Sequence, residues 1–212
     1  MVENSFEWSL FSKAPIVGIV RNLTMEEVLA VLPVFREAGL TTVEITMNTP
    51  DAGNIIRQAL TQEGRGLNIG AGTVCNKDDL EMALDSGAQF IVTPVLSKKV
   101  IKSCVKKGVP IFPGAYTPTE IYKAWTLGAA MVKIYPATSL GPQYIKDLKA
   151  PMSQLKLLPT GGVGLENMAD FLLAGADGLG IGGQLFDKQL IQNRDWDGLY
   201  QHFKKFVNIL QG

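Results

Sequence analysis

The stretch AMVKIY, residues 130–135, decides the fold class because it is a short apolar run that contains a single charged residue. A segment with helical periodicity precedes it at residues 117–128, and another follows at 141–150. A run of this length between two helical segments is typical of a buried parallel strand in a β-α-β unit. Lys133 is the unexpected residue in it, because a buried ammonium ion is costly unless its pKa shifts or it finds a partner.

The same alternation continues along the chain in both directions. Strands are predicted at residues 15–20, 41–46, 67–72, 89–93, 109–113, 130–135, 155–160 and 177–182. Helices are predicted at residues 25–39, 50–62, 76–87, 97–108, 117–128, 141–150 and 165–175, with a C-terminal helix near 195–210. This count predicts an α/β fold of the (β/α)8 TIM-barrel type, with a further N-terminal helix around residues 3–12 that covers the barrel bottom. An open doubly wound sheet is the alternative, although the first turn, VRNLT, has no glycine.

Composition limits the class of protein. The chain of 212 residues is expected to form one domain, residues 1–212, and its 20 basic and 20 acidic residues argue against a general attraction to nucleic acid or membrane. Neither a membrane-spanning stretch nor a secretory signal is expected. Cys75 and Cys104 show no pairing pattern and are expected to be free thiols of the cytoplasm. His202 is the single histidine, so neither a Ser-His-Asp triad nor a His-rich zinc site is expected in this chain.

Two charged residues are expected inside the barrel. Side chains alternate along a strand, so if Val43 and Val132 face the helices, Glu44 and Lys133 point toward the barrel axis. Catalytic groups of such barrels lie at the carboxyl ends of the strands. A lysine in a partly dry pocket can be neutral near pH 7 and attack a carbonyl to form a Schiff base. The alternative is a buried ion pair that only supports the core, although such pairs rarely add net stability.

Other lysines compete poorly for this role. Lys156 begins its strand and is therefore expected at the bottom of the barrel, where it reaches solvent. The lysines of the segment 97–108 fit the solvated face of a helix. A nucleic-acid site there is a weaker interpretation, because no aromatic residues interleave with the charges.

Glycine pairs follow the last two predicted strands. Gly161 and Gly162 end one strand, and Gly182 and Gly183 end the next. In barrels, the loops after strands seven and eight often bind phosphate through exposed backbone N–H groups. Tight turns would explain either pair alone, but two pairs at the two expected places favour a phosphate site.

Several motifs together resemble the 2-keto-3-deoxy-6-phosphogluconate aldolase family, which overlaps 4-hydroxy-2-oxoglutarate aldolase. The motifs span residues 15–186 and are VEIT with Glu44, IGAGTV with Thr73, FIVTP with Pro94, FPG at 112–114, VKIYPA with Lys133, PTGG at 159–162 and IGG at 181–183. The resemblance implies a metal-free class I aldolase without a cofactor, on a (β/α)8 barrel and typically a homotrimer. Such an enzyme cleaves a phosphorylated 2-keto-3-deoxy sugar acid to pyruvate and glyceraldehyde 3-phosphate.

The resemblance also implies roles for individual residues. Lys133 would form the Schiff base, and Glu44 would act as general acid and base through water. Thr73 would seat the pyruvate carboxylate, Thr160 would contact the region of the substrate hydroxyl, and Pro94 would belong to the substrate site. The glycines of both pairs and Gln184 would form the phosphate site.

The roles of Arg21 and Tyr135, two residues of the expected substrate site, each have two interpretations. Arg21 offers a bidentate partner for a carboxylate, or it is a charge exposed at the rim. Tyr135 donates a hydrogen bond, or it packs beside the imine.

Departures from the family pattern concern substrate choice. Gluconate-type members carry Arg where this chain has Asn48, whereas Asn48, Arg21 and the segment 141–146 resemble the 6-phosphogalactonate type. Thr160 fits the gluconate type instead, and Gln184 replaces a frequent Ser. The sequence therefore leaves the epimer open, and Asn48 is a candidate specificity residue.

Two other functions are compatible with the residues alone. In a phosphate-binding isomerase or epimerase, Glu44 would be the base and Lys133 its electrostatic partner. In a barrel that only binds a sugar phosphate, neither residue would react.

Overall fold

The computed structural model describes residues 5–211 and shows strands and helices in alternation. The strands are β1 (Ile16–Val20), β2 (Thr42–Thr46), β3 (Asn68–Gly72), β4 (Ile91–Val92), β5 (Ile111–Phe112), β6 (Gly114–Ala115), β7 (Val132–Ile134), β8 (Leu157–Pro159) and β9 (Leu179–Ile181). The helices are α1 (Trp8–Lys13), α2 (Met25–Glu37), α3 (Ala52–Glu63), α4 (Lys77–Asp85), α5 (Lys98–Lys106), α6 (Pro118–Thr126), α7 (Gly141–Lys149), α8 (Met168–Leu173), α9 (Lys188–Gln192) and α10 (Trp196–Gln211), with a 3-10 turn, η1 (Ala137–Ser139).

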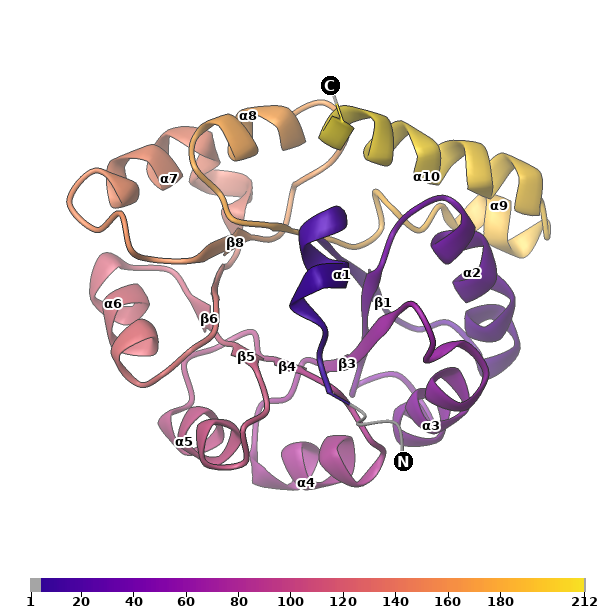
Figure 1. The fold of residues 1–212 in the computed structure, drawn as a ribbon, viewed down its shortest axis with the longest axis horizontal. Helices are drawn as coiled ribbons and strands as arrows, with labels where there is room; N and C mark the ends of the chain where they lie inside the picture. Colours follow the sequence, from indigo (N-terminus) through magenta and orange to yellow (C-terminus); the bar gives the residue numbers. More distant parts are fainter. Residues whose placement is uncertain (1–4, 212) are drawn as a thin grey trace.

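The strands form a curved parallel sheet with helices on its outer side (Figure 1). Six strands hydrogen-bond in the order β5-β4-β3-β2-β1-β9, and three more in the order β6-β7-β8. β5 and β6 lie on either side of Pro113, and one isolated bridge joins Thr160 to Gly180. Helices on the outer side of a curved sheet agree with the predicted barrel type and not with an open doubly wound sheet, whose helices cover both faces.

Every predicted strand and helix has a counterpart in the structure, and three elements were not predicted. The fifth predicted strand continues past Pro113 as β6, and η1 and α9 fill the loops after β7 and β9. The helix boundaries follow local signals. Thr24 and Thr117 form capping boxes at the starts of α2 and α6, and Gly39, Gly87 and Gly128, which follow the ends of helices, have positive φ angles.

The N-terminal segment fills the lower part of the space inside the curved sheet. α1 begins at Trp8 and lies across the middle of the ring of strands (Figure 1). Phe6 is buried against Phe90 and Phe112, with ring centroids 5.2 and 5.9 Å apart. The expectation that this segment covers the bottom is confirmed, except that residues 3–4 of the predicted helix lie outside the described residues and residues 5–7 precede α1.

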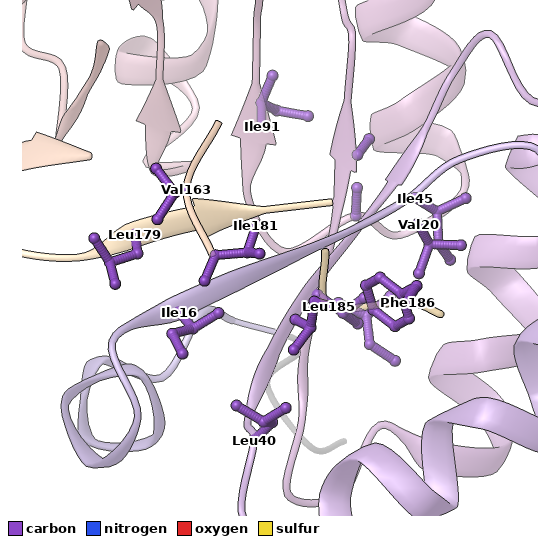
Figure 2. Close-up of a cluster of buried hydrophobic side chains, with 14 of the residues drawn as sticks. Ile16, Val20, Leu40, Ile45, Ile91, Val163, Leu179, Ile181, Leu185 and Phe186 are labelled. Atoms are coloured by element: carbon purple, nitrogen blue, oxygen red, sulfur yellow. The ribbon is translucent and has the colours of Figure 1, made fainter. Parts of the chain in front are cut away.

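The larger apolar cluster lies between the strands and the helices. Figure 2 shows Ile16 and Val20 of β1, Ile45 of β2 and Ile181 of β9 in this layer, together with Phe186 from the loop after β9. The ring of Phe186 stacks on that of Phe35 in α2, and Phe203 of α10 meets both rings edge-on. These contacts attach α2 and α10 to the sheet. Among the described residues, no helix is long and apolar enough to cross a membrane.

Candidate active site

Glu44 and Lys133 point to the inside of the curved sheet, as predicted. Their neighbours Val43 and Val132 belong to the apolar cluster that faces the helices. Glu44 is only 1% exposed and Lys133 only 5% exposed. The alternation of β2 and β7 thus brings two ionisable groups from distant parts of the chain into one buried region.

The two side chains face each other without a direct hydrogen bond. Lys133 Nζ lies 4.0 Å from Glu44 Oε1, which is beyond hydrogen-bond distance. Within residues 5–211, both carboxylate oxygens of Glu44 are buried and lack a hydrogen-bond partner. A proton can therefore pass between the two groups only through a bridging molecule, such as water or a substrate hydroxyl.

Burial shifts both groups toward their neutral forms. Desolvation raises the pKa of Glu44, while the charges of Lys133 and Arg21 act in the opposite direction. Desolvation lowers the pKa of Lys133, Glu44 opposes this shift, and Arg21 adds to it. A lysine with a lowered pKa supplies more neutral amine near pH 7, and the neutral amine is the form that attacks a carbonyl.

Gly72, at the end of β3, makes room for the Glu44 carboxylate. A Cβ atom at this position would clash with Glu44 Oε1 and lie 2.6 Å from Glu44 Cδ. Any larger residue would displace the carboxylate from its place beside Lys133. Gly72 belongs to the motif IGAGTV, and the motif alone gives no sign of this role.

A cavity of about 400 Å³ opens above Lys133. Its lining contains most of the predicted site residues, namely Arg21, Thr73, Pro94, Lys133, Tyr135, Thr160, Gly161, Gly162, Gly182, Gly183 and Gln184. Ile19 and Val163 also line it and were not predicted, because apolar residues of strand ends carry no chemical signal. Glu44 is not among the lining residues, and its burial places it behind Lys133.

Asn48 does not line this cavity. It is exposed in the turn after β2, between the buried Thr46 and Thr49. The role of Asn48 in substrate choice therefore stays a prediction.

Arg21 stands at the carboxyl end of β1 and lines the cavity. Its Nη2 donates a hydrogen bond to Thr73 Oγ1 over 3.4 Å. None of the ion pairs found among residues 5–211 involves Arg21, and its charge acts on both Glu44 and Lys133. Arg21 is exposed and lines the cavity, so its charge is available to an anion there.

Tyr135 lies two residues after Lys133, so its side chain points to the same face of the sheet. Lys133 Nζ lies 5.3 Å from the centroid of the Tyr135 ring, within the range of a cation-π contact. The ring is 39% exposed at the mouth of the cavity. This contact favours packing beside the lysine as the role of Tyr135.

The two glycine pairs differ in their local requirements. Gly162 has a φ angle of +73°, and a Cβ atom there would lie 2.7 Å from Thr138 Oγ1, so both backbone and packing require glycine. A Cβ atom at Gly183 would meet nothing within 4 Å. The free space beside Gly183 is therefore part of the cavity, and packing does not require glycine there.

Other charged residues have structural surroundings. Lys156 is 56% exposed and pairs with Asp177 at 2.9 Å, which confirms its predicted place in solvent. A second hollow, of about 360 Å³, lies between α2 and the α9 region, where Glu26 and Arg194 pair with each other in the open. Unlike the cavity above Lys133, it contains no buried ionisable side chain.

Comparison with known proteins agrees with this site. The family model "KDPG and KHG aldolase" matches residues 8–202. The chain is 38% identical over 176 residues to the 2-dehydro-3-deoxy-6-phosphogalactonate aldolase of Escherichia coli, which covers 82% of this chain and 86% of the relative. It is 35% identical over 198 residues to the 2-dehydro-3-deoxy-phosphogluconate aldolase of Haemophilus influenzae, which covers 92% of both chains.

A solved "Native KDPGal structure" superimposes with a TM-score of 0.87 at 33% identity, covering 98% of this chain and 97% of the other. Aldolases are carbon-carbon lyases, so these relatives favour that class of enzyme over an isomerase or a barrel without turnover. The chain belongs to the KDPG and KHG aldolase family.

Proposed function

We propose that this chain is a class I aldolase that cleaves 2-keto-3-deoxy-6-phosphogluconate to pyruvate and glyceraldehyde 3-phosphate, with Lys133 as the Schiff-base residue. The observation that carries the proposal is the placement of Lys133. Its amine is buried, 4.0 Å from a carboxylate, and borders a cavity that also contains Arg21 and two glycine-rich loops. The curated relatives named as aldolases support the same assignment.

The reaction begins with attack of the neutral Lys133 amine on the C2 carbonyl of the substrate. The carbinolamine then loses water to give a protonated imine, which is an electron sink. Removal of the C4 hydroxyl proton breaks the C3–C4 bond, and its electron pair moves into the imine to give an enamine while glyceraldehyde 3-phosphate leaves. Protonation of the enamine at C3 and hydrolysis of the imine release pyruvate and restore Lys133.

Glu44 is the proposed proton carrier for these steps. Its carboxylate oxygens have no protein hydrogen-bond partner within residues 5–211, and the gap to Lys133 Nζ fits transfer through one water. Burial raises the pKa of Glu44 above its ordinary value, which favours a group that both accepts and returns a proton. This proton carrier replaces the histidine that many other enzymes use.

Arg21 and the glycine loops are proposed to hold the two anionic ends of the substrate. Arg21 and Thr73 face the cavity near Lys133, where the carboxylate next to C2 would lie. The backbone of Gly162 and Gly183, together with Gln184, would bind the phosphate. Pro94 and Tyr135 would flank the reacting carbons.

The proposal leaves the C4 epimer open, and the family resemblance assigns Thr160 to the region of the substrate hydroxyl. The galactonate alternative is supported by the 38% identical relative and by Arg21 at the end of β1. Thr160 is 3% exposed, lines the cavity and donates its hydroxyl to Leu158 O over 3.1 Å. A coupled assay of pyruvate release from the two epimeric phosphorylated acids, run side by side, decides between them. The unphosphorylated 4-hydroxy-2-oxoglutarate belongs in the same series.

Borohydride trapping tests the mechanism directly. Incubation with pyruvate and borohydride should add one reduced pyruvyl group to Lys133, located by peptide mass spectrometry. Lys133→Ala should lose both the adduct and cleavage, whereas Lys156→Ala, which removes an exposed lysine, should keep both. An adduct on another lysine, or an unmodified Lys133 in the active protein, would refute the assignment.

We further infer that the strands close into an eight-stranded (β/α)8 barrel as one domain over residues 1–212. β5 and β6 are parts of one strand interrupted at Pro113, and the Thr160–Gly180 bridge lies between β8 and β9. Both features support closure.

We also propose a cytoplasmic homotrimer. A designed protein cage that is 35% identical to this chain was made "by fusing symmetric oligomeric domains", which supports an oligomer. Cys75 and Cys104 are both unpaired, as expected in a reducing compartment. Light scattering coupled to gel filtration measures the number of subunits.

A further inference from the structure

Arg21 has a side chain in the cavity and a backbone in an unusual turn. Asn22, the next residue, has a φ angle of 57°, in the left-handed region that few non-glycine residues adopt. Such a conformation persists only where surrounding contacts hold it. The direction in which Arg21 enters the cavity therefore depends on what fixes the backbone at Asn22.

The contact that fixes this turn comes from Thr49. The backbone N–H of Asn22 donates a hydrogen bond to Thr49 Oγ1 over 3.0 Å. The same oxygen lies 3.0 Å from Thr46 Oγ1, and Thr49 is only 4% exposed. One hydroxyl can accept from Asn22 and still share a hydrogen with Thr46, so both contacts form together.

This chain of hydrogen bonds links the strand of Glu44 to the turn of Arg21. Thr46 is fully buried at the end of β2, two residues after Glu44 on the same face. The backbone N–H of Thr49 also donates to Thr46 O over 2.9 Å, which closes the turn after β2. The turn that carries Arg21 is thus held against the strand that carries the carboxylate.

We propose that Thr49 is a positioning residue for Arg21. The Thr49 hydroxyl keeps the Arg21 guanidinium over the cavity, where it can bind the carboxylate of the keto acid. This inference rests on the proposed aldolase function. Thr49 itself is not among the residues that line the cavity, so it acts through the backbone of Asn22. The hydroxyl carries this role, because Thr49 Oγ1 is the atom that accepts the hydrogen bond from Asn22.

The central test compares Thr49→Val, which keeps the shape but removes the hydroxyl, with Thr49→Ser, which keeps the hydroxyl. The readout is the pyruvate concentration that gives half-maximal borohydride-trapped adduct on Lys133. Thr49→Val should raise it about five- to tenfold, as loss of one hydrogen bond predicts, and Thr49→Ser should stay near wild type. Thr61→Val, a change at an exposed threonine of α3, is the matched control and should have no effect.

A double-mutant cycle separates positioning from general destabilisation. In an Arg21→Gln background, Thr49→Val should have no further effect on half-saturation, because the group that it positions is gone. Thr49→Ala removes the same hydroxyl with a smaller side chain, and it should raise half-saturation in the Arg21 protein. This second variant keeps the test available if Thr49→Val folds poorly.

The outcomes distinguish the two proposals. If the wild-type protein forms no pyruvyl adduct, the proposed function is wrong and the positioning role is overturned with it. If the adduct forms but Thr49→Val has equal effects with Arg21 and with Gln at position 21, or if Thr49→Ser is as impaired as Thr49→Val, only the positioning role is overturned.

Discussion

Replacing the buried ion pair by apolar residues should stabilise this protein while abolishing catalysis. Glu44 and Lys133 are 1% and 5% exposed, and their charged atoms are 4.0 Å apart, too far for a hydrogen bond. Both Glu44 oxygens lack a hydrogen-bond partner within residues 5–211, so desolvation of the pair is poorly compensated. The double variant Glu44→Met/Lys133→Met keeps similar volume and removes both buried ionisable groups.

The size of the effect follows from the geometry of the pair. Exchange of a buried ion pair for well-packed apolar residues is neutral or stabilising by about 1–4 kcal/mol. A pair without direct hydrogen bonds belongs to the stabilising part of this range. Each kcal/mol should raise the midpoint of thermal unfolding by about 2–4 °C for a chain of this size.

The single variants should show opposite dependences on pH. In Lys133→Met, the charge that lowers the pKa of Glu44 is gone, so the folded state keeps a proton that the unfolded state loses, and stability falls as pH rises above about 4.5. In Glu44→Met, the charge that raises the pKa of Lys133 is gone. The unfolded state then keeps a proton that the folded state has lost, and stability rises as pH approaches 10.5.

Guanidinium unfolding followed by circular dichroism, at several pH values, measures all three variants against wild type. Lys102→Met, at an exposed position on α5, is the matched control and should stay within about 0.5 kcal/mol of wild type. A double variant less stable than wild type, or single variants whose stabilities change with pH in the same direction, would refute the view that this pair is kept at a cost to stability.

Three further outcomes are expected. The rate of imine formation should rise with pH, because Lys133 reacts as the neutral amine, and the midpoint of this rise should lie below the ordinary lysine pKa of 10.5. Stopped-flow trapping at a series of pH values measures the midpoint. A midpoint at 10.5 or above would contradict the prediction. Gly162→Ala should raise the KM for phosphorylated substrate at least tenfold, because the new Cβ would lie 2.7 Å from Thr138 Oγ1 and distort the proposed phosphate loop. The effect on 4-hydroxy-2-oxoglutarate should be small, and equal losses with both substrates would argue against a phosphate role. Phe6→Ala should cost about 3–5 kcal/mol of unfolding free energy, since Phe6 is buried against two other rings; a loss under 1 kcal/mol would show that the N-terminal segment is not part of the core.

The sequence contains enough information for the fold class and for the direction of the key side chains. Alternation along β2 and β7 places Glu44 and Lys133 on the inner face, and the structure confirms it. Alternation says which face a side chain occupies, but not how far apart two side chains on different strands lie. The 4.0 Å separation of the pair depends on the curvature of the sheet and on the space left by Gly72.

The features that sequence reasoning missed depend on contacts between distant segments. α9 has only five residues, too few to show a helical period. The hydrogen bond from Asn22 to Thr49 crosses between two loops, and neither residue belongs to a recognisable motif. Asn48 was chosen because it departs from a family pattern, and a strand pattern does not say how far a side chain in the following turn lies from the cavity; Asn48 is exposed and does not line it.

The interior of the curved sheet has two layers, and the lower layer prepares the upper one. On the inner face of β3, Gly70 leaves room for the ring of Phe90, while Gly72 leaves room for the carboxylate of Glu44. Phe90 packs with Phe6 in an apolar cluster that keeps water out from below. Desolvation is the largest cause of the shifts at both Glu44 and Lys133, so the apolar floor contributes to the neutral amine that the proposed reaction needs. The N-terminal segment therefore serves reactivity as well as stability, although it lies at the end of the curved sheet opposite to the cavity.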